Sequence, residues 1–90
     1  MDHNIHNHLL KVCKGLANSN RLKVLQIISN SKTPLGVNEI AKRLKLKQAN
    51  VSAHLKYLRL NKIVKAKQDG LNMYYTINDS LAQKLIDILG

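Results

Sequence analysis

A short segment in the middle of the chain carries side chains of the kinds that bind the edges of nucleic-acid bases. The candidates for base contacts are Gln48, Asn50, Ser52, Ala53 and Lys56. Gln and Asn can each make two hydrogen bonds to adenine, Ser can donate or accept one, and Ala can contact a thymine methyl group. These residues predict a helix that reads base pairs in the major groove. The alternative is that Gln48, Asn50 and Ser52 do no more than begin the helix.

The segment lies in a region that reads as two short amphipathic helices joined by a tight turn. Apolar residues of the first helix are Val37, Ile40, Ala41 and Leu44, and those of the second are Val51, Leu55 and Leu58. Both sets are spaced three or four apart, as on one face of a helix. Leu46 lies in the turn, where it can fill the angle between the helices. The pattern is typical of a helix-turn-helix, whose second helix enters the major groove.

The charge distribution supports a polyanionic partner. The chain has 15 Lys plus Arg and 5 Asp plus Glu. Nine basic residues and no acidic one lie between Ile40 and Gln68: Lys42, Arg43, Lys45, Lys47, Lys56, Arg59, Lys62, Lys65 and Lys67. A lysine-rich composition would explain the total, but it would not explain the missing acids. A block of one sign on a folded motif predicts a surface for DNA phosphates.

Several side chains in this block are candidates for phosphate contacts, which position a protein without specifying sequence. They are Lys45, Lys47, Arg59, Lys65 and Lys67. Lys47 takes a helix N-cap position without a capping side chain, which forfeits about 1 kcal/mol. His54 borders the apolar face, so we expect it to be packed or to contact a phosphate rather than bind a metal.

A β-hairpin follows the second helix of this motif. Residues 63–67 and 71–77 are two β-prone runs around an Asp69-Gly70 turn. A hairpin in this position is a wing, and Lys65, Lys67, Gln68 and Asn72 place polar and basic groups near its tip. We expect these groups to reach the DNA backbone or the minor groove.

Three further helices are predicted outside this region. The first spans about Ile5 to Ala17, with Leu9, Leu10, Cys13, Leu16 and Ala17 on one side. The second begins at an Asn18 N-cap and ends in a loop over residues 29–34. The last runs from Asp79 to Leu89 and has almost no polar face, so it needs cover from more than its own small domain.

Length and composition limit the function classes. The 90 residues make one domain, 1–90, in which residues 1–8 are expected to be a flexible tail. No apolar run is long enough for a membrane span and no secretory signal is recognisable, so we expect a cytoplasmic protein without a membrane partner. One cysteine cannot form an internal disulfide. No nucleophile–base pair, phosphate-cradling loop or paired carboxylates indicate an enzyme, and no cofactor is implied.

The order of elements, mainly α with a β-hairpin wing (α-α-α-α-β-β-α), resembles the ArsR/SmtB family of winged helix-turn-helix bacterial repressors. The residues that carry the resemblance are Leu16–Ile28, Pro34–Tyr75 and the closing helix, and they include the Q-x-x-V-S-x-H-L signature at Gln48–Leu55 and the pair Tyr74-Tyr75. It extends over about residues 9–89.

The resemblance implies a homodimer that binds operator DNA and is joined through its first and last helices. The residues implied at the dimer interface are Leu9, Leu10, Cys13, Leu81, Leu85, Ile88 and Leu89. The alternative function is a winged-helix module that binds an acidic protein partner.

The metal sites of well-known family members are missing from the sequence. Gly36 and Asn38 stand where one site has two cysteines. Asp79 matches the aspartate of another, but Leu81 replaces its histidine. Three N-terminal histidines remain as weak candidates for metal ligands: His3, His6 and His8. His3 would also complete an N-terminal Cu(II) or Ni(II) motif with Met1 and Asp2, although a polar tail is the simpler interpretation.

Overall fold

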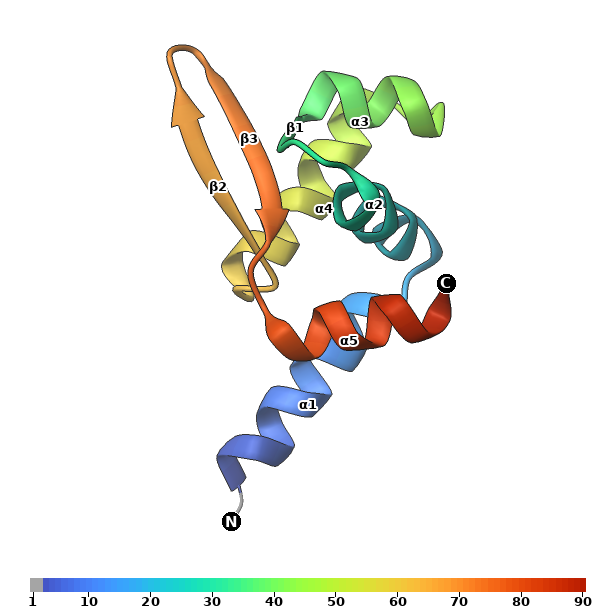
Figure 1. Ribbon diagram of the computed structural model, residues 1–90, viewed down its shortest axis with the longest axis vertical. Helices are drawn as coiled ribbons and strands as arrows, with labels where there is room; N and C mark the ends of the chain where they lie inside the picture. The colour runs from blue at the N-terminus through green and yellow to red at the C-terminus, as the bar shows by residue number, and fades with distance from the viewer. Residues whose placement is uncertain (1–2) are drawn as a thin grey trace.

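The computed structural model describes residues 3–90 as five helices and a small antiparallel sheet (Figure 1). The elements are α1 (His3–Leu16), α2 (Ser19–Asn30), β1 (Leu35–Gly36), α3 (Val37–Leu44), α4 (Gln48–Leu60), β2 (Val64–Asp69), β3 (Asn72–Ile77) and α5 (Ser80–Leu89). The predicted order of helices and hairpin is confirmed, and the fold is a winged helix-turn-helix. No helix in the described part of the chain is long and apolar enough to cross a membrane.

The sheet contains one strand that the sequence pattern did not predict. Its order is β1-β3-β2, and β1 pairs with β3 through Leu35↔Tyr75 and Gly36↔Tyr74. The pairing ties the start of α3 to the wing, because α3 begins at the residue that follows Gly36.

The hairpin turn lies one residue later than expected. Asp69 is the last residue of β2 and pairs with Asn72, so the two turn residues are Gly70 and Leu71. Gly70 has a φ of 64°, whereas Leu71 is not among the residues of positive φ. Glycine at the first central position followed by a residue of negative φ is the pattern of a type II′ turn.

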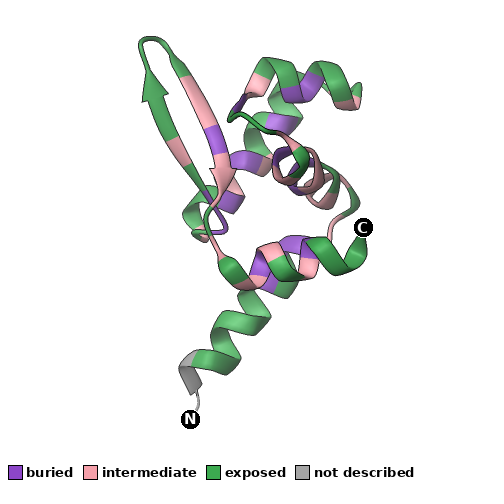
Figure 2. Ribbon diagram, in the orientation of Figure 1, coloured by how far each residue is buried: buried purple, intermediate pink, exposed green. Residues whose placement is uncertain are grey.

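The core lies among α2, α3, α4 and the base of the sheet, and the inner faces of α1 and α5 contribute to it (Figure 2). Leu25, Ile40, Leu55, Leu58 and Ile63 are all 0% exposed. No polar or charged residue is buried among the described side chains, so the core is held by aliphatic packing.

Helix α1 turns a different face to the core than the sequence suggested. Val12, which the expected apolar face leaves out, is fully buried. Cys13 and Ala17 are exposed, while Leu16 is buried as predicted. Helix α1 also begins at His3, so residues 3–8, expected as a tail, form its first turns.

The structure shows how three of the helices begin, and the predicted Asn18 N-cap is confirmed. The Asn18 side chain accepts a hydrogen bond from the Arg21 N–H at 3.0 Å. Asp79 likewise accepts one from the Ala82 N–H at 2.8 Å. Gly36 is the N-cap of α3 and has no side-chain capping bond, and Glu39 pairs with Arg43 at 3.0 Å. Helix α2 continues to Asn30, so the loop expected from residue 29 starts at residue 31.

Candidate nucleic-acid interface

The helix-turn-helix corner is formed by a short left-handed turn between α3 and α4. Lys45 caps α3 with a φ of 57°, a conformation that costs a non-glycine residue free energy. The Leu46 N–H then binds the Ala41 carbonyl oxygen at 3.0 Å. Leu46 packs half-buried against the core, as predicted. The corner therefore holds α4 at a fixed angle while leaving the Lys45 side chain exposed.

The inner face of α4 anchors the helix to the domain. Val51, Leu55 and Leu58 are each 0% exposed, as their spacing predicted. The N-cap residue Lys47 makes no side-chain capping bond. The first backbone N–H groups of α4 therefore have no side-chain partner in the turn and can face solvent or an anion.

The outer face of α4 presents the predicted base-contacting residues, but not all on one stripe. Gln48, Asn50, Ser52, Ala53 and Lys56 are all exposed. Since successive residues turn by about 100°, Gln48 and Asn50 lie on opposite edges of the exposed face. Ser52, Ala53 and Lys56 lie between these edges.

The middle of this stripe includes Ala49, which was not among the predicted base-contacting residues although Ala53 was. Ala49, Ser52, Ala53, Lys56, Arg59 and Tyr75 line one shallow hollow along the helix. Tyr75 is almost fully buried and comes from β3. The small side chains leave room for a base edge or a thymine methyl group to approach the helix closely.

A second groove separates the wing from the starts of α3 and α4. It has a volume of about 470 Å³. Its helix side includes Glu39, Gln48 and Ser52, and its wing side includes Leu71 and Asn72. The structure thus brings two of the base-contact candidates together with the wing tip. Asn72 was predicted to take part, and Leu71 was not.

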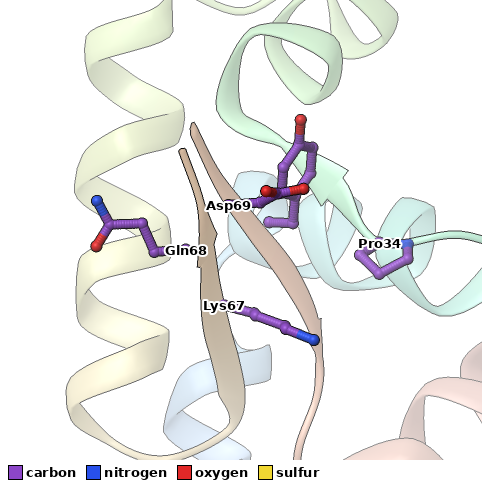
Figure 3. A pocket seen from close by; sticks show the side chains of 5 residues that line it. Pro34, Lys67, Gln68 and Asp69 are labelled. Carbon is purple, nitrogen blue, oxygen red and sulfur yellow. The ribbon is translucent and has the colours of Figure 1, made fainter. Parts of the chain in front are cut away.

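The wing residues divide between the two faces of the hairpin. Side chains alternate along a strand. Buried Val64 and half-buried Ala66 pack on the core, so Gln68 continues their face. Lys65 and Lys67 lie on the opposite face, and in Figure 3 Lys67 and Gln68 point to opposite sides of β2. Both lysines are exposed, but they point away from the side of the sheet that packs on the core.

His54 lies on the edge of α4 that faces α2, not in the middle of the exposed stripe. It is half-buried, and burial together with the nearby Arg21 guanidinium lowers the pKa of His54 below its ordinary value of 6.5. Arg21 also stacks 4.2 Å from the centre of the Tyr57 ring and donates hydrogen bonds to the Lys14 and Gly15 carbonyl oxygens. The neutral imidazole is therefore favoured still more strongly at pH 7, and a contact of His54 with a phosphate would use an N–H group rather than a positive charge.

The lowered pKa of His54 gives a pH prediction. The folded state disfavours the charged imidazole, so protonation of His54 favours unfolding. The stability that the neutral His54 side chain contributes is present above pH 6.5 and is lost as the pH falls through the lowered pKa. Arg21→Met should raise the pKa of His54 toward its ordinary value without reaching it, since burial is the larger cause. Arg21→Lys, which keeps the charge, should leave the pKa low. An NMR titration of the His54 ring checks both, and an unchanged pKa in Arg21→Met would contradict the assigned role of Arg21.

Exposed apolar side chains gather on α1 and α5, away from the helix-turn-helix. Leu9 and Leu10 on α1 and Ile88 and Leu89 on α5 are all at least two-fifths exposed, with Ile88 at 78%. The other predicted dimer residues divide between surface and core. Cys13 is exposed, while Leu81 and Leu85 already pack partly against the core.

The aspartate in the position of a family metal ligand is committed to structural bonds. Asp79 Oδ1 accepts the capping bond of α5, and its Oδ2 lies 2.8 Å from His8 Nε2 on α1. Among the described residues, no three His, Cys, Asp or Glu side chains come together as a metal site. The N-terminal motif of His3 with Met1 and Asp2 lies partly outside the described residues, and the role of the exposed His6 stays untested.

Comparisons with known proteins agree on one family. The model described as "Bacterial regulatory protein, arsR family" matches residues 18–66. Transcriptional repressor PagR of Bacillus anthracis is 35% identical over 79 residues, which cover 88% of this chain and 78% of PagR. Transcriptional activator HlyU of Vibrio cholerae is 30% identical over 76 residues, which cover 84% of this chain and 68% of HlyU.

Solved structures show the same fold. The crystal structure of PagR has a TM-score of 0.90 at 31% identity and covers 99% of this chain and 100% of its own. HlyU from Vibrio cholerae has a TM-score of 0.88 at 28% identity, covering 99% and 94%. A Mycobacterium bovis domain described as a homodimeric winged helix-turn-helix DNA-binding domain has a TM-score of 0.83 at 25% identity, covering 97% and 79%. The chain therefore belongs to the ArsR family of bacterial regulatory proteins, and it is a DNA-binding regulator of transcription rather than an enzyme.

Proposed function

We propose that this protein is a homodimeric repressor that binds double-stranded operator DNA, with α4 in the major groove and the wing beside the adjacent minor groove. The observation that carries the proposal is the exposed stripe of α4. Ser52, Ala53 and Lys56 offer base-contacting groups on a helix whose opposite face is completely buried. The chain from Ile40 to Gln68 around it contains no acidic residue, and Glu39, which lines the groove beside the wing, is paired with Arg43.

The assignment of a homodimer rests on the apolar surface of α1 and α5. Ile5, Leu9, Leu10, Ile88 and Leu89 are exposed large hydrophobic side chains on these two helices. A second copy would remove this surface from water and would place two α4 helices on successive turns of one face of the duplex. The Mycobacterium bovis relative, whose description names it homodimeric, supports this arrangement.

The direction of control that we propose is repression, which agrees with the name of the relative at the higher identity. PagR, the relative at 35% identity, is named a repressor, while HlyU at 30% identity is named an activator. We propose that operator binding blocks transcription and that it does so in the cytoplasm. We also propose that it does so without the two family metal sites, because Gly36, Asn38 and Leu81 replace their ligands. The alternative of a module for an acidic protein partner loses its support, since the family is one of DNA-binding regulators.

Gel retardation of the protein's own promoter region, in competition with random duplex DNA, tests the proposal. We expect a retarded band that survives an excess of random DNA, because regulators bind specific sites more tightly than non-specific ones, by about a thousandfold or more. Transcription from the same promoter in vitro should fall as protein is added. Retardation without preference for the promoter, or increased transcription, would contradict the repressor assignment.

Two substitutions separate base reading from phosphate binding. Gln48→Ala should lower the preference for operator over random DNA by about 1–3 kcal/mol if Gln48 binds an adenine with two hydrogen bonds. Lys67→Ala should instead weaken both DNAs similarly and lower the slope of log affinity against log salt by about one unit. Binding isotherms at several salt concentrations distinguish the two. Equal losses on operator and random DNA for Gln48→Ala would rule out its place in the groove.

A further inference from the structure

The wing ends in an apolar side chain that the fold does not use. Leu71 is 100% exposed. Among the described residues outside α1 and α5, the one other exposed large hydrophobic side chain is that of Leu60 at the end of α4, at 68%. The turn requires glycine only at Gly70, whose φ is positive. The neighbouring position tolerates polar residues, so neither packing nor backbone geometry calls for a leucine there.

The tip that carries Leu71 is held in a defined shape. The hairpin ladder continues to the last pair, Asp69↔Asn72, and the Gln68 side-chain amide donates a hydrogen bond to the Gly70 carbonyl oxygen at 3.2 Å. Nothing lies within 4 Å of a Cβ added at Gly70, so the tip is in open space. A leucine on a braced turn loses less conformational entropy on binding than one on a free loop.

The position of Leu71 relative to α4 identifies what it can meet. Leu71 and Asn72 line the same groove as Gln48 and Ser52 of α4. In Figure 1 the wing tip and α3 lie at the end of the molecule opposite to the start of α1. If α4 occupies the DNA major groove, the sugar–phosphate backbone of one DNA strand passes along this groove of the protein. The tip of the wing then faces the adjacent minor groove of the DNA.

We propose that Leu71 is an apolar wedge that enters the operator minor groove and partly unstacks one base step, so that the protein bends its DNA. This inference rests on the proposed function. Apolar side chains inserted in this way kink a duplex, and the cost depends on the step that is opened. Flexible pyrimidine–purine steps open most readily, so Leu71 would select sequence at a position where it forms no hydrogen bond.

The experiment compares DNA bending and affinity for three variants on the promoter fragment that the wild-type protein retards. Leu71→Ser should lower operator affinity by roughly tenfold and reduce the bend measured by circular-permutation gel shift. Leu71→Met keeps an apolar tip and should keep both. Leu60→Ser removes an exposed leucine at the last residue of α4, at the opposite end of this helix from Gln48, and should leave the bend unchanged. Circular dichroism should show that every variant is folded, since both leucines are largely exposed.

The outcomes separate this inference from the proposed function. If the wild-type protein prefers its promoter but the Leu71→Ser variant binds and bends the promoter equally well, the proposed role of Leu71 is wrong. The proposal that the protein binds an operator is then unaffected. If Leu71→Ser weakens random DNA and operator alike without a change of bend, Leu71 is a general contact and the wedge is again overturned. If the wild-type protein shows no preference for its promoter, the operator proposal fails and the wedge fails with it.

Discussion

Replacing Ile88 with aspartate should convert the protein to a monomer and lower its affinity for operator DNA at least about a hundredfold, because two linked helix-turn-helix units gain roughly that much from joint binding. Ile88 is 78% exposed on α5, so the charge disturbs little of the protomer's own core. In the proposed dimer the same side chain would be covered by a second copy. A carboxylate there would lose its hydration without a partner, which is costly.

Light scattering or sedimentation measures the first effect, and gel retardation on the promoter measures the second. Leu60→Asp is the matched control, because Leu60 is also well exposed, at 68%, but lies on α4 away from α1 and α5. It should leave the oligomeric state unchanged. A dimeric Ile88→Asp protein with normal operator binding would show that the α5 surface is not the interface. A monomer that still binds with full affinity would separate dimerisation from DNA binding.

The helix-turn-helix was predictable because local sequence and tertiary packing favour the same structure there. The apolar spacing of Val51, Leu55 and Leu58 defines one face of a helix, and all three side chains are buried in the core. The Asn18 and Asp79 caps were predictable for a similar reason, since each binds a backbone N–H three residues ahead.

The features that could not be predicted depend on distant partners. Strand β1 has only two residues and exists because Leu35 and Gly36 pair with β3. Helix α1 carries apolar residues on more than one side, and nothing in the pattern tells which of them faces the helix's own core. The structure buries Val12 and leaves Leu9 and Leu10 exposed.

The candidate site was predictable in its exposure but not in its geometry. The predicted set included Asn50, which does not line the hollow along α4, and left out Ala49, which does. The lowered pKa of His54 could not be foreseen either, because the Arg21 guanidinium comes from another helix. Leu71 was unnoticed because an apolar residue next to a turn carries no signal until its exposure is known.

Gly15→Ala should destabilise the protein by about 1–3 kcal/mol, which is the usual cost of overfilling a core. Helix propensity alone predicts the opposite, since alanine is favoured over glycine inside a helix by about 1 kcal/mol. Gly15 is buried in α1, and a Cβ added there would overlap Ile63 Cδ1 and lie 3.6 Å from Leu58 Cδ2. Ile63 and Leu58 are both 0% exposed, so neither can swing out to solvent.

The double variant Gly15→Ala/Ile63→Val shows whether this contact is the cause. Ile63→Val removes the Cδ1 atom that the new methyl group would meet, and alone it should cost about 0.5–1.5 kcal/mol. If the overlap is the cause, the double variant should be more stable than the sum of the single changes by about 1 kcal/mol or more. Thermal unfolding at one fixed protein concentration measures this, since each kcal/mol shifts the Tm by roughly 4–8 °C in a domain of this size. A raised Tm for Gly15→Ala alone would mean that α1 can move away from Ile63, and that glycine is not required for the close approach of these two elements.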